Sequence, residues 1–132
     1  MIDVDDFKAV NDRHGHDVGD VVLQEVAARI KEITTARCCG RLGGEEFSAF
    51  LVGTLPQVHA LGARLNQAMT HRPMNGLNIS ISISISIGIA SSMNCAMTHE
   101  LMVEADRQLY RAKKAGKNQY AMDPSLSQAY QG

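Results

Sequence analysis

The chain has 132 residues, of which 45% are hydrophobic, 20% charged and 5% aromatic, and its formal net charge is −1. This composition is typical of a single globular domain, and it excludes collagen-like and strongly disordered chains. A chain of this length buries roughly 65–70% of the surface that its unfolded form exposes, so we expect it to fold without disulfides or a structural metal.

The first third of the chain predicts a strand and two helices. Residues 1–4 lean apolar and are typical of the last residues of a strand, so we expect the domain to be truncated at its N-terminus. Residues 6–14 favour a short helix that ends at Gly15. Asp17 is the predicted N-cap of a longer helix, whose apolar residues recur at helical spacing and predict a buried stripe: Leu23, Val26, Ala27, Ile30 and Ile33.

A hairpin and a third helix follow. Two short apolar runs, residues 37–42 and 47–52, flank Gly43 and Gly44, and this spacing is typical of a β-hairpin with a tight turn. Pro56 is suited to the first turn of a helix. The apolar residues after it keep helical spacing: Val58, Leu61, Leu65 and Met69.

Residues 78–90 form a low-complexity run in which isoleucine alternates with serine, and this period of two predicts a long strand. The serine face is either solvated or closely packed, because small side chains allow a helix to approach. Such a repeat specifies the register of a strand weakly. We assign no chemistry to it.

The last part of the chain predicts a helix, a short strand and a tail. Thr98 is the predicted N-cap of the helix, which ends at Gly116. Residues 118–122 predict the strand, and residues 123–132 predict a disordered tail. The order β, α, α, β, β, α, β, α, β over residues 1–122 predicts one α/β (α+β) domain, in which helices flank a mixed, mostly antiparallel sheet.

The sequence carries no sign of a membrane span or of an oxidising compartment. No apolar run approaches the roughly 18 residues of a span, and the N-terminus lacks the layout of a signal peptide. The three cysteines, at positions 38, 39 and 95, have neither a disulfide pattern nor zinc-ligand spacing, so we expect reduced thiols. We therefore predict a cytoplasmic domain, either free or as the cytoplasmic part of a membrane-anchored signalling protein.

The charges are distributed unevenly along the chain. Residues 1–20 hold six aspartates, whereas residues 107–117 hold five basic residues and no acidic one. If folding brings the two ends together, they form an acidic rim that attracts metal beside a basic rim that attracts phosphate. The alternative is two unrelated solvated faces.

Acidic residues near the first strand and the hairpin are candidate metal ligands. Asp3 and Asp5 lie two apart on an extended segment, which directs both carboxylates to one face. If the hairpin lies beside that strand, Asp3 and Glu45 converge on a hard cation such as Mg²⁺, which keeps positions open for substrate phosphates. The alternative is that these residues and Glu46 are exposed loop acids.

The glycines and histidines allow two interpretations each. Gly43 and Gly44 lack side chains, so their N–H groups can approach a phosphate or a nucleobase, although these residues alone favour a plain hairpin turn. The P-loop and G-x-G-x-x-G motifs are absent from the sequence. His14 and His16 have no further metal ligand nearby in sequence, so we expect capping or a hydrogen bond to substrate rather than zinc binding.

Three ordered motifs resemble the GGDEF domain of diguanylate cyclases, in its GGEEF form. They are MIDVDDFKAVND over residues 1–12, GHDVGD over residues 15–20 and RLGGEEF over residues 41–47. Shorter matches, SISIG, AD, YRAK and GKN, extend the similarity over nearly all of residues 1–122. The resemblance implies a fold like the palm of nucleotidyl cyclases and polymerases, and the condensation of two GTP molecules into cyclic di-GMP and two pyrophosphates.

The resemblance also implies roles for individual residues. Asp3, Glu45 and the carbonyl of Val4 resemble the ligands of Mg²⁺ or Mn²⁺. Glu45 or Glu46 resembles the group that assists deprotonation of the 3′-hydroxyl, which the metal also polarises. The positions that resemble substrate contacts are Asn11 and Asp20 for the guanine base, Lys8, Lys113 and Lys117 for the triphosphate, and His16, Gly43 and Gly44 for further contacts with GTP.

The resemblance implies partners as well. Each subunit holds one GTP and ring closure needs two opposed half-sites, so we expect a homodimer, controlled by an upstream sensory or regulatory domain. No nucleic acid partner is expected. The leading hypothesis is a catalytic diguanylate cyclase domain, and the alternative is a GTP-binding regulatory module without turnover.

The sequence departs from the family pattern in three places. Lys117 replaces an arginine that is common in the family, so a bidentate contact becomes a point charge and phosphate affinity is expected to fall. Thr34 and Arg37 occupy the positions of the family's inhibitory R-x-x-D product site, so we expect that form of feedback to be absent. The family also has a helix and an L-T-G-L-P-N-R-like segment before the first strand, and neither is present in residues 1–132.

Overall fold

The order of helices and strands agrees with the order that the sequence predicts. The structure is a computed structural model, and it describes residues 1–35, 38–71, 81–93 and 95–126. Its elements are β1 (Ile2–Val4), α1 (Phe7–His14), α2 (His16–Thr34), β2 (Cys38–Gly43), β3 (Glu46–Phe50), α3 (Leu55–His71), β4 (Ile85–Ile89), α4 (Thr98–Lys114) and β5 (Gln119–Met122).

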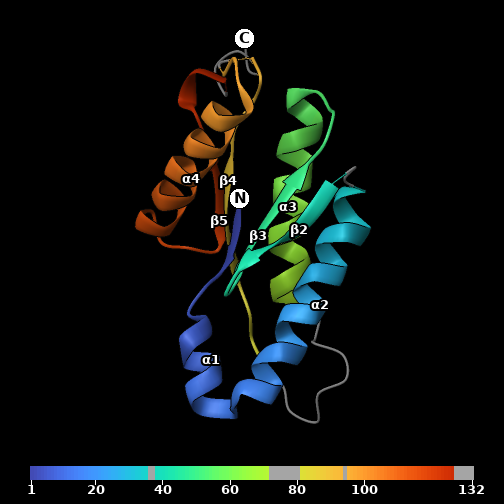
Figure 1. Ribbon diagram of the computed structural model, residues 1–132, viewed down its shortest axis with the longest axis vertical. Helices are drawn as coiled ribbons and strands as arrows, with labels where there is room; N and C mark the ends of the chain where they lie inside the picture. The colour runs from blue at the N-terminus through green and yellow to red at the C-terminus, as the bar shows by residue number, and fades with distance from the viewer. Residues whose placement is uncertain (36–37, 72–80, 94, 127–132) are drawn as a thin grey trace.

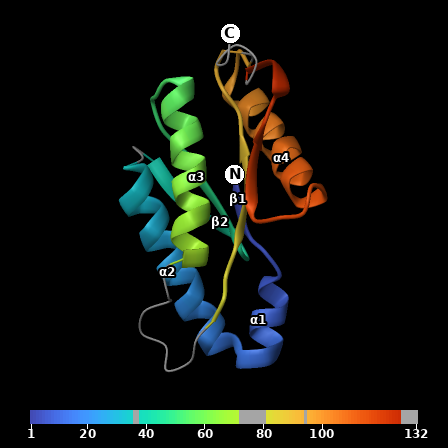
Figure 2. The same cartoon turned by 180° about the vertical axis from the view of Figure 1, so that it is seen from behind.

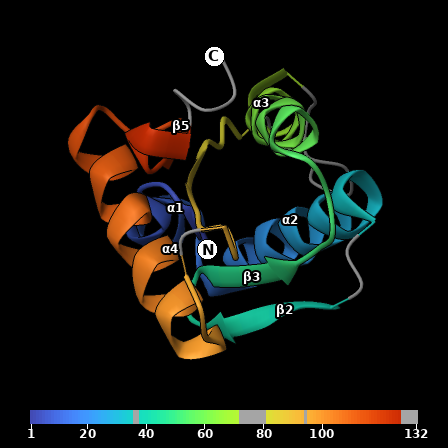
Figure 3. The ribbon, with the colours of Figure 1, turned by 90° about the horizontal axis from the view of Figure 1, so that it is seen from above.

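Among the described residues, five strands form one mixed sheet in the order β2-β3-β1-β4-β5. The central strand β1 pairs antiparallel with β3 and with β4, β2 pairs antiparallel with β3, and β5 runs parallel to β4. Helix α4 lies on one side of the sheet, and α2 and α3 lie on the other (Figures 1 and 3). The prediction of a mixed, mostly antiparallel sheet flanked by helices is confirmed, and the hairpin does lie beside the first strand.

The core fills the space between the sheet and the helix pair α2 and α3, which Figure 2 shows from behind. The predicted stripe of α2 is buried there, with Ala27 half-buried at its edge. Arg29 lies in the same interface with an exposed fraction of 1%. Its Nη1 donates to the carbonyl oxygen of Ala68 at 2.8 Å, and its Nε donates to Glu25 at 3.0 Å, so this buried charge is hydrogen-bonded.

Two predicted N-caps are wrong, by two residues in α2 and by one residue in α4. Gly15 takes the N-cap position of α2, so Asp17 lies in the first turn. Met97 takes the N-cap position of α4, so Thr98 is the first helical residue. Asp17 still lies where a negative charge favours a helix N-terminus, and this is why it resembles a cap in the sequence.

The long strand predicted over residues 78–90 is too long. Strand β4 spans Ile85–Ile89, residues 81–84 are not in a strand, and residues 72–80 lie outside the described residues. The ladder with β1 pairs Val4 with Ile85 and stops, because Asp6 adopts a left-handed φ of 53° and the chain turns into α1.

The serine face of this segment is closely packed at β4. Ser86 has an exposed fraction of 0%, and α4 crosses directly over Gly88. Of the two alternatives for this face, close approach of a helix is therefore confirmed over solvation.

The predicted tail is partly structured. Residues 124–126 form a helical turn in which Leu126 is buried, whereas residues 127–132 lie outside the described residues. Among the described residues, Cys39 and Cys95 form no disulfide. In the part of the chain that the structure describes, no helix is both long and apolar enough to cross a membrane.

Gly88→Ala is expected to lower the free energy of unfolding by about 2–3 kcal/mol, because a Cβ at this position overlaps with the backbone of α4 at Ala105 and Leu109. Gly40→Ala is the matched control, since the space around Gly40 on β2 is open. Urea unfolding of the two variants measures the difference. Equal losses of stability would contradict the close contact of α4 with β4.

Candidate active site

The predicted metal ligands meet on the central strand. Asp3, with an exposed fraction of 3%, lies on β1 opposite Glu46 of β3 in the ladder. The N–H of Val4 donates to the carbonyl oxygen of Glu45 at 3.2 Å, which holds the β2–β3 turn against β1. Glu45 and Glu46 are half-buried. We call Asp3, Glu45 and Glu46 the acidic cluster.

The environment of Asp3 is unusual for a carboxylate. Burial raises its pKa, Lys113 lowers it through a hydrogen bond and its positive charge, and the charges of Glu45 and Glu46 raise it, with a net upward shift. The Nζ of Lys113 donates to Asp3 Oδ2. The other oxygen, Oδ1, is buried without a hydrogen-bond partner among the described residues. A buried carboxylate oxygen without a donor, close to two further acids, fits a bound cation.

The donor set suits a metal that retains water. Among the described residues, no three His, Cys, Asp or Glu side chains are arranged to hold a metal ion. The candidate donors are therefore two carboxylates, Asp3 and Glu45, with the carbonyl of Val4. Mg²⁺ is usually held by one or two carboxylates together with waters and substrate phosphates, so this small set is sufficient for it.

The two ends of the chain come together at this site. Lys113, on the last turn of α4, pairs with Asp3, and Lys117, in the α4–β5 turn, donates to Asp6 at 2.7 Å. An acidic rim beside a basic rim is therefore confirmed over two unrelated faces. Lys113 is partly exposed and Lys117 is exposed, so both ammonium groups remain accessible.

The predicted base-reading residues lie on α1 and α2. The Oδ1 of Asn11 is buried against Gly19, where a Cβ would overlap with it, and has no hydrogen-bond partner among the described residues. Asp20 follows Gly19 and is exposed. It lines a hollow of about 840 Å³ between α2 and strands β2 and β3, together with Lys31 and Arg41. The structure thus places Asn11 beside the residue that precedes Asp20, and their roles stay predictions.

The remaining predicted substrate contacts are exposed. Lys8 lies on α1 and His16 is the first residue of α2. Gly43 and Gly44 lie at the β2–β3 turn, where Gly44 has a left-handed φ of 51° that favours glycine. The Nε of Arg41 donates to the carbonyl oxygen of Gly44 at 2.8 Å and closes this turn.

Asp5 shares the face of Asp3, as predicted, but it contacts a different set of groups. Asp3 lies opposite Ser86 in the ladder with β4, and the hydroxyl of Ser86 donates to Asp5, so both carboxylates lie on the face of Ser86. The carboxylate of Asp5 also accepts hydrogen bonds from Ser84 and the backbone of Asn118. We call Asp5, Ser84, Ser86 and Asn118 the Asp5 network. The predicted site residues do not include the two serines, although their spacing of two was the available signal.

The positions of the family's product site are partly visible. Thr34 is buried at the end of α2, and its hydroxyl donates to the carbonyl oxygen of Ile30 at 2.6 Å. Arg37 lies outside the described residues. The expected absence of this form of feedback stays a prediction.

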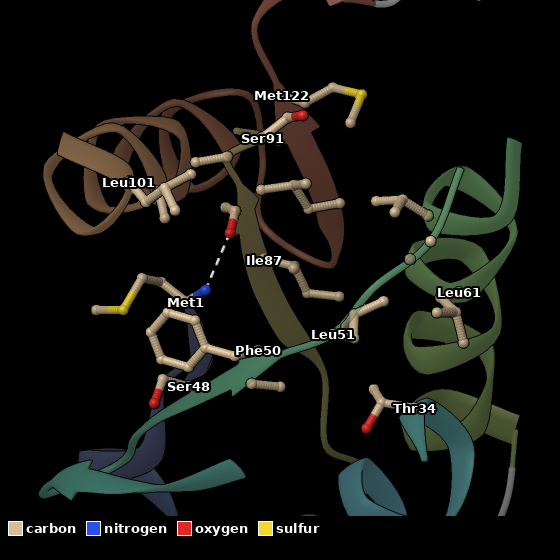
Figure 4. A pocket seen from close by; sticks show the side chains of 18 of the residues that line it. Met1, Thr34, Ser48, Phe50, Leu51, Leu61, Ile87, Ser91, Leu101 and Met122 are labelled. Atoms are coloured by element: carbon tan, nitrogen blue, oxygen red, sulfur yellow. Dashed lines mark hydrogen bonds between the residues drawn. The ribbon is translucent and has the colours of Figure 1, made fainter. Parts of the chain in front are cut away.

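An apolar cavity of about 450 Å³ lies apart from the acidic cluster and from the predicted substrate contacts (Figure 4). Its lining includes Leu51, Leu61, Ile87 and Leu101, and the amine of Met1 donates to the carbonyl oxygen of Gly88 at its edge, at 3.0 Å. No member of the acidic cluster and no predicted substrate contact lines this cavity. It is therefore not the candidate active site.

Comparison with known proteins identifies the family. Residues 1–119 match the model described as diguanylate cyclase, GGDEF domain. The chain belongs to this family, and the GGDEF resemblance found in its motifs is confirmed.

Individual relatives agree with this assignment. The bifunctional diguanylate cyclase/cyclic di-GMP phosphodiesterase MucR of Pseudomonas aeruginosa is 41% identical over 134 residues, which cover 98% of this chain and 19% of the relative. The diguanylate cyclase DgcS of Shewanella oneidensis is 31% identical over 95% of this chain and 42% of its own length. The chain thus spans less than half of these curated relatives.

Solved structures share the fold. The active GGEEF domain of a diguanylate cyclase from Vibrio cholerae superposes with a TM-score of 0.78 at 28% identity, over 92% of this chain and 78% of that chain. The GGDEF domain of DgcB from Caulobacter crescentus, in complex with c-di-GMP, gives a TM-score of 0.80 at 28% identity, over 92% of this chain and 74% of that chain. The expected cyclase-like fold is confirmed.

Lys113→Met is expected to lower the free energy of unfolding at neutral pH. We expect about 1–2 kcal/mol, less than for a fully buried pair, because the Lys113 side chain is 37% exposed. The pKa of Asp3 in the folded protein already lies above its ordinary value, and loss of Lys113 raises it further. The penalty is therefore absent where Asp3 is protonated in both states, below its ordinary pKa of 3.8, and grows as the pH rises through the folded pKa.

Urea unfolding at neutral pH and below this ordinary pKa measures the effect. Lys114→Met is the matched control, because the Nζ of Lys114 lies 5.3 Å from the ring centroid of Tyr110, whereas Lys113 is the lysine that pairs with Asp3. A loss of stability in Lys113→Met that does not depend on pH would contradict the pairing with Asp3.

Proposed function

We propose that this domain is a diguanylate cyclase that condenses two GTP molecules into cyclic di-GMP and two pyrophosphates. The observation that carries the proposal is the buried Asp3 Oδ1, which has no donor among the described residues and lies close to Glu45 and Glu46. Lys113 pairs with Asp3, and Lys117 pairs with Asp6 just beyond the same strand. This combination suits a substrate that brings both a divalent cation and a triphosphate.

Asp3, Glu45 and the carbonyl of Val4 would hold Mg²⁺ or Mn²⁺ in this proposal. When bound, the metal neutralises phosphate charge and polarises the attacking hydroxyl. Lys113 neutralises Asp3 while the site is free of nucleotide. Where a bound cation neutralised Asp3 instead, Lys113 would be able to contact the triphosphate. Lys8 and Lys117 add positive charge along the same phosphates.

The chemistry is a phosphoryl transfer between two bound nucleotides. The 3′-oxygen of one GTP forms a bond to the α-phosphorus of the other, the bond from that phosphorus to the bridging oxygen of pyrophosphate breaks, and the hydroxyl proton passes to Glu45 or Glu46. Two such transfers close the ring. The position of both glutamates beside β1, where Glu46 lies opposite Asp3 and Glu45 accepts from the N–H of Val4, supports this role.

Base selection is assigned to Asn11 and Asp20. A carboxylate accepts from both the N1–H and the N2 amino group of guanine, and an amide serves its remaining groups. The Oδ1 of Asn11 lies against Gly19 of α2 and has no hydrogen-bond partner among the described residues, which supports a recognition role. His16, Gly43 and Gly44 are proposed as further contacts with GTP, through an exposed imidazole and exposed backbone.

Turnover is proposed to need two copies of the domain. One subunit presents one set of these residues, whereas ring closure requires two opposed nucleotides. A regulatory part upstream of these residues is proposed to bring the two copies together. The reaction is proposed for the cytoplasm, because the three cysteines have no disulfide pattern in the sequence.

Asp3→Asn and Glu45→Gln are each expected to abolish formation of cyclic di-GMP and to remove the Mg²⁺ dependence of GTP binding, because each removes negative charge opposite the cation. The measurement is incubation with GTP and Mg²⁺ followed by chromatographic separation of the products. Asp12→Asn is the matched control, since Asp12 is an exposed carboxylate on α1. Full turnover in Asp3→Asn would contradict the metal assignment.

The same assay separates the two functional hypotheses. A fused N-terminal coiled coil is expected to raise specific activity by forcing two copies together. GTP binding without product, even in this fused dimer, would instead favour a regulatory module. Lys117 supports that alternative, because a lysine contacts phosphate as a point charge where an arginine makes two hydrogen bonds.

Asp20→Ala is expected to weaken the preference for GTP over ATP by about tenfold, because a site built to hydrogen-bond a base loses an acceptor. Competition between the two nucleotides in a binding assay measures the preference. Asp12→Ala serves as control on the neighbouring helix. An unchanged preference in Asp20→Ala would show that another residue reads the base.

A further inference from the structure

The Asp5 network joins three distant parts of the chain. The Oγ of Ser84 donates to Asp5 Oδ2 at 2.7 Å, the Oγ of Ser86 donates to Oδ1 at 2.6 Å, and the N–H of Asn118 donates to Oδ2 at 3.0 Å. The N–H of Asp5 also donates to the carbonyl oxygen of Ser84 at 3.0 Å. Asp5 is 7% exposed, so these donors stabilise a nearly buried charge.

The bond from Asn118 holds the α4–β5 turn, which needs external support. Lys117 and Asn118 have φ values of 64° and 48°, in a left-handed region that such residues rarely adopt. A conformation of this kind persists only where its surroundings enforce it. The carboxylate of Asp5 supplies one such constraint, directly at Asn118.

The same turn carries the two lysines that face the acidic rim. Lys113 lies on the last turn of α4 and pairs with Asp3, while Lys117 pairs with Asp6. Between these two ion pairs, Asp5 holds the backbone of the turn itself. Three acids within four residues of the β1 end therefore each hold a different point of the α4–β5 connection.

We infer that Asp5 is a positioning residue, which fixes the α4–β5 turn against the end of β1 and so places Lys113 and Lys117 beside the acidic cluster. The inference rests on the proposed function in that these lysines bind the triphosphate. Asp5 itself is not a metal ligand. Both of its oxygens accept hydrogen bonds from the protein, whereas Asp3 keeps one oxygen without a donor among the described residues.

The inference also gives the serine face of β4 a task. Ser86 is fully buried, and a hydroxyl there is costly unless it is hydrogen-bonded. The partner of this hydroxyl is Asp5. If Ser84 and Ser86 were alanines, the buried carboxylate of Asp5 would lose two hydrogen-bond donors. The two serines thus hold the carboxylate of Asp5 toward Asn118.

Asp5→Ala is expected to weaken binding of GTP by about tenfold, the size typical for loss of a group that orients another. Binding of GMP, which lacks the β- and γ-phosphates, should be unchanged. Asp5→Asn should restore most of the GTP affinity, because an amide oxygen can accept from Asn118 while the amide nitrogen donates to a serine hydroxyl. Calorimetric titration of the folded variants with the two nucleotides and Mg²⁺ measures both affinities.

Ser82→Ala is the matched control, since Ser82 is the exposed serine two residues before Ser84. If Asp5→Ala does not fold, Ser84→Ala and Ser86→Ala take its place and should each give a smaller loss of GTP affinity. Equal losses for GTP and GMP would overturn the inference, because they indicate a general structural role. A defect in Asp5→Asn as large as in Asp5→Ala would overturn it as well, since a metal ligand needs the charge.

The rate of hydrogen exchange at the backbone N–H of Asn118 tests the inference independently of the proposed function. Exchange in Asp5→Ala is expected to be at least about tenfold faster than in the parent, because the acceptor of that N–H is removed. If the parent binds no GTP, the proposed function fails, while faster exchange still supports the positioning of the turn. Unchanged exchange would overturn the inference whatever the nucleotide affinities.

Discussion

The structure depends on burying two carboxylates at the end of a very short central strand. Strand β1 has three residues, and both Asp3 and Asp5 are almost inaccessible, at 3% and 7% exposure. Buried charges of this kind are destabilising unless they are paired and hydrogen-bonded. Their partners, Lys113 and Asn118, come from the other end of the chain. If helix α4 and the turn after it left the sheet, Asp3 would lose Lys113 and Asp5 would lose the N–H of Asn118.

Sequence spacing predicts those parts of the fold that neighbouring residues determine. The buried stripe of α2 and the hairpin around Gly43 and Gly44 follow from local periodicity and turn chemistry, and the structure contains both. The length of β4 depends instead on where β1 ends, roughly 80 residues earlier in the chain, and local alternation carries no information about that. The predicted N-cap of α2 was wrong for a smaller reason, because an acid in the first turn also interacts favourably with the helix N-terminus.

The candidate site was predictable as a set of residues and not as an arrangement. The motifs name Asp3 as a metal ligand and Lys113 as a phosphate contact, two separate tasks. In the structure these two side chains, 110 positions apart, are paired with each other. Each is therefore the counter-ion of the other until a ligand separates them, and this competition follows only from their distance in space.

The close approach of α4 to Gly88 also settles how β4 is aligned with its neighbours. Along the isoleucine and serine repeat, a slip of two residues leaves the pattern of side chains unchanged, and Ser82 or Ser84 would face Asp5 as well as Ser86 does. Glycine is the one residue of the repeat that breaks this equivalence. A slip that moved Ser86 into its place would drive a side chain into the backbone of Ala105 and Leu109. A single missing side chain thus distinguishes one alignment from others that the repeat makes almost equal.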